Sequence, residues 1–166
     1  LTGLQTVKQE INTLINLIRV QKARQEFDLA NTDMSLHIVF SGNPGTGKTT
    51  VARHLAKIYK CLGVLDKGHL VETDRSGMIA EYVGQTAIKV NKLVDSALNG
   101  VLFIDEAYAI LIDDKDTYGR EAIATLLKRM EDDRDKLIVI LAGYTGEMQT
   151  FIDSNPGLKS RFNKYI

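Results

Sequence analysis

The sequence predicts an α/β fold in which a five-stranded parallel sheet is the middle of three layers, with helices on both faces. Strand-like apolar runs alternate with segments of helical spacing, which is the pattern of a parallel sheet with crossover helices. The runs Val101–Ile104 and Leu137–Ala142 contain no polar residue, as expected for strands that are buried on both faces. A glycine-rich segment, Gly42–Thr49, follows the first apolar run. The fold therefore places a glycine-rich turn at the carboxyl end of a strand.

The first half of the chain opens with a predicted amphipathic helix, from Thr6 to about Phe27. Apolar residues recur three or four positions apart between Leu4 and Ile18. The repeat lasts only about two heptads, too few for a coiled coil, so we expect this helix to pack on the chain's own sheet. The other elements of this half are the strand Leu36–Ser41, the helix Lys48–Cys61, the strand His69–Thr73 and the loop Asp74–Gly77.

The second half continues the alternation. Helical spacing over Gln85–Leu98 ends at Asn99-Gly100, a typical helix stop. The apolar runs already named provide two strands. The remaining elements are the helices Glu121–Met130 and Glu147–Ile152, the turn Asn155–Gly157 and a short fifth strand, Lys164–Ile166.

The composition is that of one globular domain. Of the 166 residues, 44% are hydrophobic and 25% are charged. Basic and acidic residues number 21 each, so no charge excess points to nucleic acid or an anionic membrane as a partner. Cys61 is the sole cysteine, and neither a signal peptide nor a membrane-spanning run is evident, which together favour the cytoplasm. The chain begins at Leu1 without methionine, so we expect it to be part of a longer protein.

Residues Gly42–Thr49 fit the pattern G-x-x-x-x-G-K-[ST], the phosphate-binding P-loop. Its glycines permit backbone torsions that turn amide N–H groups toward a phosphate chain. Lys48 supplies a positive charge for the outer phosphates, and the Thr49 hydroxyl is the expected Mg²⁺ contact. The preceding strand and the following helix are the context that this motif requires. The predicted nucleotide contacts are Asn43, Pro44, Gly45, Thr46, Gly47, Lys48, Thr49 and Thr50.

A second chemical signal is the pair Asp105-Glu106, directly after the buried strand Val101–Ile104. Ligands of open α/β sheets bind beyond the carboxyl ends of the strands, where the P-loop also lies. We expect Asp105 to hold Mg²⁺ through its water shell and Glu106 to orient or deprotonate an attacking water. The three histidines lie on separate elements without ligand-like spacing, so we expect them to be structural.

A GTPase or a small-molecule kinase is the first alternative. Asp74–Gly77 fits the D-x-x-G switch pattern, and Asn91-Lys92 resembles the guanine-reading N-K-x-D. However, Val94 stands where that motif requires aspartate, the two segments are too close together, and Asp105-Glu106 has no role in the scheme. Competition between ATP and GTP for the site would discriminate between these alternatives.

The chain resembles the AAA+ ATPases over almost its whole length, and within them the CbxX/CfqX group. This group includes stage V sporulation protein K, to which we expect the greatest likeness, and the red-type Rubisco activase. The segments that carry the resemblance are Leu1–Leu4, Gly42–Arg53, Glu81–Ala87, Val101–Ile110, Ile140–Tyr144 and Asn155–Phe162.

The resemblance implies a large AAA+ subdomain that binds ATP and Mg²⁺ and hydrolyses ATP. It also implies a ring-shaped homo-oligomer, a hexamer for the full-length protein, that remodels or threads a client protein. The sequence does not identify the client, since a sporulation-type remodeller and a Rubisco-activating motor share all of these motifs. Neutral charge disfavours a DNA-directed AAA+ protein. A scaffold that only binds nucleotide has no need of Glu106.

Further site residues are implied by position in the matching motifs. Gly3 and Leu4 belong to the segment that lies against the adenine in this superfamily. Thr145 aligns with the polar sensor that contacts the γ-phosphate or the attacking water, with Tyr144 as the alternative contact. Arg161 matches the arginine finger, which acts on the nucleotide of a neighbouring subunit. The pore loop that grips the client corresponds to Tyr82, Val83 and Gly84.

The family continues into a helical lid subdomain, which is absent from these 166 residues. We therefore expect this stretch by itself to bind ATP-Mg²⁺ weakly, to be mostly monomeric and to hydrolyse ATP slowly. The arginine finger and the lid would have to come from elsewhere.

Overall fold

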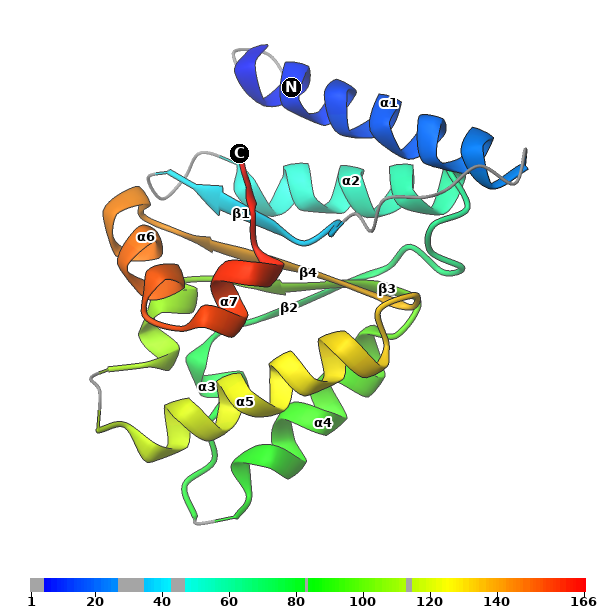
Figure 1. The fold of residues 1–166 in the computed structure, drawn as a ribbon. Helices are drawn as coiled ribbons and strands as arrows, with labels where there is room; N and C mark the ends of the chain where they lie inside the picture. The colour runs from blue at the N-terminus through cyan, green and yellow to red at the C-terminus, as the bar shows by residue number, and fades with distance from the viewer. Residues whose placement is uncertain (1–4, 27–34, 43–46, 83, 113–114) are drawn as a thin grey trace.

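The computed structural model of the chain describes residues 5–26, 35–42, 47–82, 84–112 and 115–166. Figure 1 shows the arrangement of its helices and strands. The strands are β1 (Ile38–Ser41), β2 (Leu70–Thr73), β3 (Gly100–Ile104), β4 (Leu137–Gly143) and β5 (Lys164–Tyr165). The helices are α1 (Gln5–Glu26), α2 (Lys48–Cys61), α3 (Arg75–Met78), α4 (Thr86–Ala97), the 3₁₀ helix η1 (Ala107–Ile110), α5 (Thr117–Asp132), α6 (Thr145–Asp153) and α7 (Pro156–Arg161).

The five strands form one parallel sheet in the order β2-β3-β4-β1-β5. The predicted parallel sheet is therefore confirmed. Every residue of β3 and β4 is buried, which accounts for their uninterrupted apolar sequences. In the register of the sheet, Ser41 pairs with Gly143. The carboxyl ends of β1 and β4 thus lie side by side, next to the end of β3.

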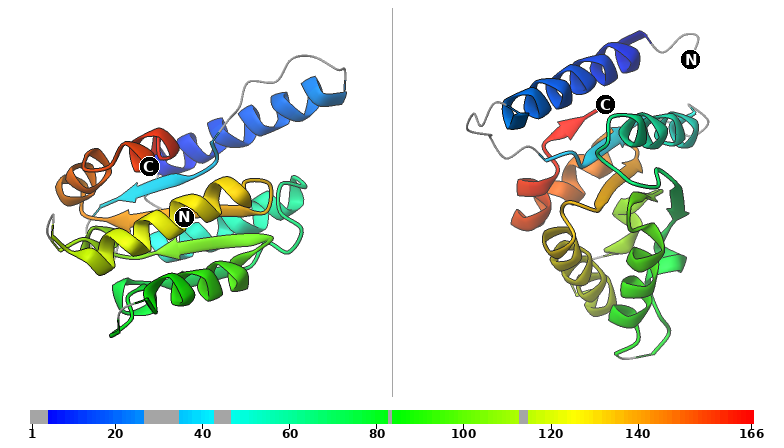
Figure 2. Two further views of the ribbon diagram at one scale, coloured as in Figure 1. Left: turned by 60° about the horizontal axis from the view of Figure 1, so that its bottom comes forward. Right: turned by 90° about the vertical axis from the view of Figure 1, so that its right-hand side faces the viewer.

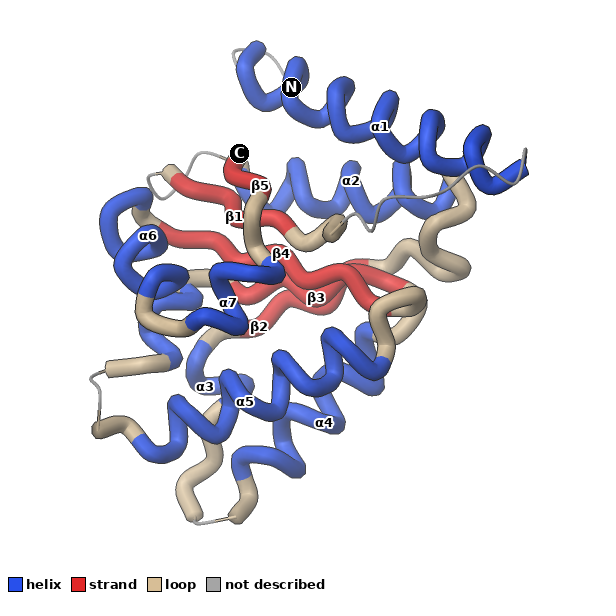
Figure 3. Tube along the Cα trace, in the orientation of Figure 1, coloured by secondary structure: helices blue, strands red, loops and turns tan. Residues whose placement is uncertain are grey.

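Helices cover both faces of the sheet, so the three-layer arrangement is confirmed (Figures 1 and 2). Figure 3 shows the strands as a central layer between the two groups of helices. Alternate residues of β3 divide between two hydrophobic cores. Val101 and Phe103 join the core with α1 and α2, while Leu102 and Ile104 join the core with α4, α5 and α6. Helix α1 packs on this chain through Ile11, Leu14 and Ile18, as its spacing predicted.

Three short helices were not predicted, and here the sequence interpretation was wrong. The segment interpreted as a loop, Asp74–Gly77, contains most of α3, and the turn at Asn155–Gly157 opens α7. The 3₁₀ helix η1 was missed as well. Helices of four to six residues are too short to show hydrophobic periodicity. Their caps are the better signal, since the side chain of Asn155 accepts hydrogen bonds from the N–H groups of Gly157 and Leu158.

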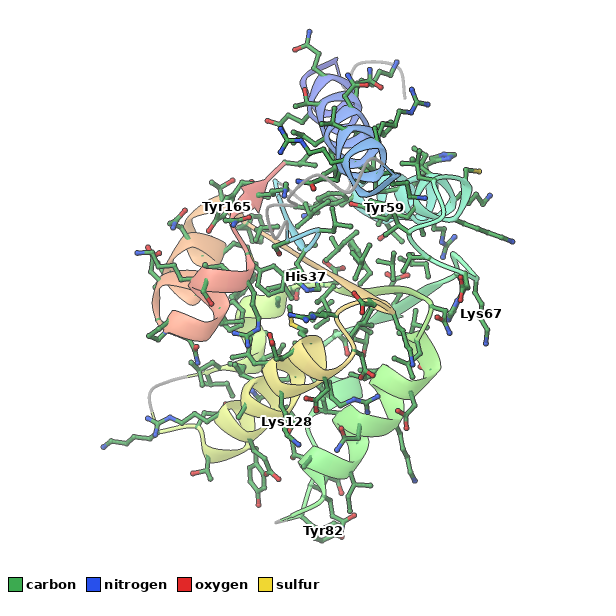
Figure 4. The ribbon with its side chains drawn as sticks, turned by 45° about the vertical axis from the view of Figure 1, so that its right-hand side comes forward. His37, Tyr59, Lys67, Tyr82, Lys128 and Tyr165 are labelled. Carbon is green, nitrogen blue, oxygen red and sulfur yellow. The ribbon has the colours of Figure 1, made fainter. Side chains whose placement is uncertain are left out.

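His37 is a structural residue, as expected from its isolated position. Its ring is 8% exposed, and Nδ1 accepts a hydrogen bond of 3.0 Å from the N–H of Val139 in β4. The ring also lies 5.6 Å from that of Phe162, centroid to centroid, and Figure 4 shows it in the interior. Burial, and to a smaller extent the positive charges of Arg161 and Lys164, lowers the pKa of His37 to about 4. The folded protein therefore holds His37 neutral.

We expect the neutral state of His37 to make stability depend on pH. Because the folded pKa is below the ordinary value of 6.5, the unfolded chain binds the extra proton between these two values. The contribution of His37 to the free energy of unfolding should therefore be constant above pH 6.5. Below that pH the free energy of unfolding should fall, by roughly 3 kcal/mol once the pH has dropped to about 4. Urea unfolding of the parent and of His37→Asn at a series of pH values measures this contribution.

The asparagine variant is chosen because its Oδ1 takes the place of Nδ1 as an acceptor but does not titrate. Carboxylates contribute equally to both proteins, so the difference between the two curves isolates His37. Parallel curves would show that His37 is not the titrating group.

Candidate functional site

The amino end of α2 is built as an anion site. Gly47, at the N-cap position, has φ 79° and ψ 21°, a left-handed conformation that favours glycine. A Cβ at Gly47 would meet nothing within 4 Å, so the backbone torsion rather than space requires glycine. Among the described residues no side chain caps this helix, which leaves the N–H groups of its first turn for a ligand.

A cavity of about 300 Å³ opens where α2 meets the carboxyl ends of β3 and β4. This is the lower end of the volume range that is usual for ligand pockets. It joins the described part of the P-loop to the predicted acidic pair, two segments about 60 residues apart in the sequence. Its lining residues are Gly47, Lys48, Thr49, Thr50, Asp105, Glu106, Gly143 and Tyr144.

Lys48 and Thr49 are the first two residues of α2, and both line the cavity. The ammonium of Lys48 donates a hydrogen bond of 2.9 Å to the carbonyl oxygen of Gly42, at the other end of the P-loop. The charged end of the Lys48 side chain therefore lies beside Gly42, the first residue of the P-loop. This position suits a group that neutralises a phosphate.

Asp105 and Glu106 continue the chain from β3 into the cavity. The N–H of Asp105 donates to the carbonyl oxygen of Thr73, 2.8 Å away, which extends the pairing of β2 and β3 beyond the strands. One Asp105 carboxylate oxygen, Oδ1, accepts from the N–H of Glu106 at 3.0 Å. Asp105 is thus fixed by the sheet, while Glu106 is exposed.

The backbone of Glu106 adopts the left-handed conformation, with φ 48° and ψ 49°. Among the described residues other than glycine, only Asn99 shares a positive φ. Such a conformation costs on the order of 1 kcal/mol for a residue with a Cβ, and strained residues cluster at functional sites. Glu106 is thus a strained residue in the lining of the cavity.

The two sensor candidates are placed differently. Tyr144 lines the cavity, and its ring lies 6.5 Å from that of Tyr108 in η1. Burial, followed by the negative charges of Glu106 and Glu147, raises the pKa of Tyr108, so its hydroxyl keeps its proton. Thr145 is the exposed first residue of α6 and is not among the lining residues.

Arg161 lies away from the cavity, at the end of α7. Its Nη2 is 3.7 Å from a carboxylate oxygen of Glu131, and its Nη1 donates to the carbonyl oxygen of Gly157 at 3.2 Å. The side chain keeps 28% of its surface exposed. Arg161 is therefore not among the described residues that line the cavity of its own chain.

The Tyr82 side chain is 72% exposed. Figure 4 places it at the tip of a loop at the end of the molecule opposite α1. Gly84 follows in a left-handed conformation, φ 81°. An exposed aromatic beside a glycine is available to contact another molecule.

Several predicted site residues lie outside the described part of the chain. They are Gly3, Leu4, Asn43, Pro44, Gly45, Thr46 and Val83. One lining residue was missed by sequence reasoning, since Gly143 marks the site only because β4 pairs with β1. The sheet order would have been needed to find it.

The residues present suit a nucleotide with Mg²⁺. The Thr49 hydroxyl and the Asp105 carboxylate line the same cavity, and both are oxygen ligands of the kind that Mg²⁺ takes. In the part of the chain that the structure describes, no group of three or more His, Cys, Asp or Glu side chains is placed to hold a metal. Mg²⁺ at Thr49 and Asp105 would need phosphate and water oxygens to complete its shell, which is its usual mode of binding.

The segments that suggested a GTPase have structural roles. Asp74 caps α3, with its side chain accepting from the N–H of Gly77 and the hydroxyl of Ser76. Asn91 accepts a hydrogen bond of 3.2 Å from Arg129 of α5. Neither Asp74 nor Asn91 is among the cavity lining.

None of the helices within the described ranges has both the length and the apolar character needed to cross a bilayer.

Three curated proteins whose names describe different processes have the same sequence identity to this chain. Stage V sporulation protein K of Bacillus subtilis is 46% identical over 98% of the chain and 50% of its own length. The chloroplastic ribulose bisphosphate carboxylase/oxygenase activase of Cyanidioschyzon merolae is 46% identical over 100% of the chain and 57% of its own length. The ESX-3 secretion system protein EccA3 of Mycobacterium tuberculosis is 46% identical over 99% of the chain and 26% of its own length.

These equal identities do not distinguish the sporulation protein, to which we expected the greatest likeness, from the other relatives. The chain spans between about a quarter and somewhat more than half of the length of these relatives. Residues 38–166 match the family model named AAA, the ATPase family associated with various cellular activities. This match covers the P-loop helix, the acidic pair and all five strands, and the chain therefore belongs to the AAA ATPase family.

Proposed function

We propose that this chain is the large nucleotide-binding subdomain of a motor that binds ATP-Mg²⁺ and hydrolyses ATP to remodel or thread a client protein. The observation that carries the proposal is the single cavity shared by Gly47, Lys48, Thr49, Asp105 and Glu106. An uncapped helix end and a lysine would bind the phosphates, and the carboxylates lie opposite them. A site that only binds nucleotide does not require a strained, exposed glutamate.

Each residue has a defined part in the proposed reaction. Lys48 binds the outer phosphates, and Thr49 and Asp105 hold Mg²⁺. The ion supplies electrostatic stabilisation of the charge on the phosphoryl oxygens. Glu106 orients the attacking water and accepts its proton. Thr145 would sense the bound nucleotide, and its neighbour Tyr144, which lines the cavity, is the alternative.

Arg161 is proposed to complete the site of a neighbouring copy, because it does not reach the cavity of its own chain. A guanidinium suits the charge that spreads over the transferred phosphoryl group. Head-to-tail assembly of identical chains into a closed ring, which we propose to be a cytoplasmic hexamer of the full-length protein, would supply this contact. Tyr82 would then grip the client.

The names of the relatives suggest different clients, and the similarity of the chain does not choose among them. Similar identities to a sporulation protein, a carboxylase activase and a secretion-system protein support a shared motor rather than a shared client. The segments that choose the client would lie in the parts of those proteins that this chain does not cover. We propose the sporulation-type client and the carboxylase as the first two to test.

Equilibrium binding tests the nucleotide assignment. A fluorescent ATP analogue should bind the full-length protein in the presence of Mg²⁺ and be displaced by ATP more readily than by GTP. Lys48→Ala should weaken binding by at least roughly tenfold, since a charge-assisted contact to phosphate is lost.

The control for this experiment is Lys57→Ala, which removes an exposed lysine of the same helix away from the cavity. It should leave the affinity unchanged. Equal displacement by GTP, or full affinity in Lys48→Ala, would contradict the proposed site.

A further inference from the structure

Arg75 joins α3 to the segment that runs from the end of η1 to the start of α5. It is the first residue of α3, just after β2. Its Nη1 donates to the carbonyl oxygens of Ala109 and Ile110, at 2.9 and 2.5 Å, and to a carboxylate oxygen of Asp116 at 2.9 Å. A single guanidinium therefore holds the last two carbonyls of η1 and the residue before α5.

Asp116 is the anchor of this contact. Its carboxylate also accepts hydrogen bonds from the N–H groups of Ile112 and Gly119, so it closes the loop between η1 and α5 and caps α5. Burial by itself would raise the pKa of Asp116, but these N–H groups and Arg75 lower it overall. The side chains of Arg75 and Asp116 are only 28% and 7% exposed, so water screens their attraction less than at the surface.

On one side, the contact reaches the proposed catalytic carboxylate. Helix η1 starts directly after Glu106, and the N–H of Ala109 donates to the carbonyl oxygen of Glu106 at 2.9 Å. Only the four residues of η1 separate Glu106 from the end that Arg75 holds. A change in the backbone of Glu106, which is already strained, would move η1 as a short rigid piece.

On the other side, the contact reaches the loop that carries Tyr82. Lys89 of α4 donates to the carbonyl oxygens of Ser76 and Ile79, which ties the end of α3 to α4. The buried Thr86 accepts from the N–H of Ala80, which closes the base of the loop. The Tyr82 loop is therefore attached at its base to the end of α3 and to α4.

We propose that Arg75 is a positioning residue that couples Glu106 to the Tyr82 loop, an inference that rests on the proposed function. Movement of the Glu106 segment on nucleotide binding is passed through η1 to Arg75, and through α3 to the loop that contacts the client. Lysine cannot replace Arg75 here, because its ammonium nitrogen is one bond closer to the backbone than Nη1 and falls short of the three oxygens that Nη1 contacts.

The absence of tryptophan from these 166 residues permits a direct test. Tyr82→Trp in the full-length protein places a fluorophore on the loop. Binding of a non-hydrolysable ATP analogue with Mg²⁺ should change its emission, measured as the difference from the full-length parent under the same conditions. Arg75→Lys in this background should bind the analogue with the same affinity within about threefold, but should lose most of the emission change. Affinity and loop response are thereby separated.

Two further variants make the result specific. Asp116→Asn keeps an oxygen to cap α5 but loses the charge that holds Arg75, and it should also lose most of the emission change. Arg129→Lys disturbs a clamp between α4 and α5, made with Asn91, Asp95 and Asp133, that does not touch η1. It should keep the emission change. This variant therefore controls for a nonspecific loss of packing between α4 and α5.

The outcomes separate the coupling from the proposed function. If the Tyr82→Trp protein does not bind the analogue, the proposed nucleotide site is wrong and the coupling falls with it. If the analogue binds without an emission change, the nucleotide site stands and the coupling is wrong. The coupling is equally wrong if Arg75→Lys and Asp116→Asn respond as the parent does, or if Arg129→Lys loses the response to the same extent.

Discussion

Replacement of Glu106 by glutamine is expected to reduce ATP turnover by roughly 10²- to 10⁴-fold, the usual contribution of a general base. Glutamine keeps the size of the side chain but cannot accept the proton of the attacking water. Nucleotide affinity should be unchanged or tighter, because a negative charge beside the phosphates is removed. Steady-state phosphate release and equilibrium ATP binding, both on the full-length protein, measure the two quantities separately.

The matched control for this experiment is Glu10→Gln, an exposed residue of α1 that is not among the cavity lining. It makes the same chemical change and should leave turnover unaltered. Turnover within about threefold of the parent in Glu106→Gln would reject Glu106 as the base, because a general base contributes far more. The ATP-loaded variant also provides a stable complex with which to test the two proposed clients.

Replacement of Arg161 by alanine is expected to lower turnover by roughly 10³- to 10⁵-fold, if the residue acts as an arginine finger. The ion pair with Glu131 that is lost is 3.7 Å long, and its glutamate partner is 63% exposed. Its contribution to folding stability should therefore be below about 1 kcal/mol. Loss of activity without loss of stability would indicate a role in the reaction rather than in the fold.

Mixed rings test whether the arginine acts on a neighbour. Arg161→Ala subunits keep an intact P-loop, whereas Lys48→Ala subunits keep an intact Arg161, and each protein alone should be inactive. In randomly mixed rings about a quarter of the interfaces combine the intact P-loop with the intact arginine. Mixing should therefore restore a measurable fraction of the parent's activity.

The control for the mixing experiment is Lys159→Ala, which removes a 70% exposed cation from the same helix α7. It should remain active without a partner. A mixture that stays inactive, although the two variants assemble together, would mean that Arg161 does not act between subunits.

Elements with a local signature could be predicted from the sequence. The strand β1, the P-loop and α2 are contiguous, so the motif and its context appear in one stretch of chain. β3 and β4 were predicted because burial on both faces requires an apolar residue at every position. The short helices α3 and α7 were missed, since polar capping contacts rather than a repeating apolar face define them.

The candidate site was predicted only in part, for a related reason. Asp105 and Glu106 could be assigned to the cavity because the carboxyl ends of parallel strands share one edge. The place of Gly143 depends on the pairing of β4 with β1, which follows from the order of strands and not from any residue type. The choice between Tyr144 and Thr145 is a matter of where β4 ends and which way the next residue faces.

The sequence by itself predicted the chemistry that we propose, because a glycine-rich phosphate loop and an acidic pair after a buried strand are local patterns with few physical uses. Only the tertiary structure decided what these groups are attached to. It gave Glu106 its left-handed backbone, kept Arg161 out of the cavity of its own chain, and joined Arg75 to Asp116, which lies 41 residues away. Such contacts form when the sheet and its two layers pack, and packing across the sheet leaves no repeating signal along the chain.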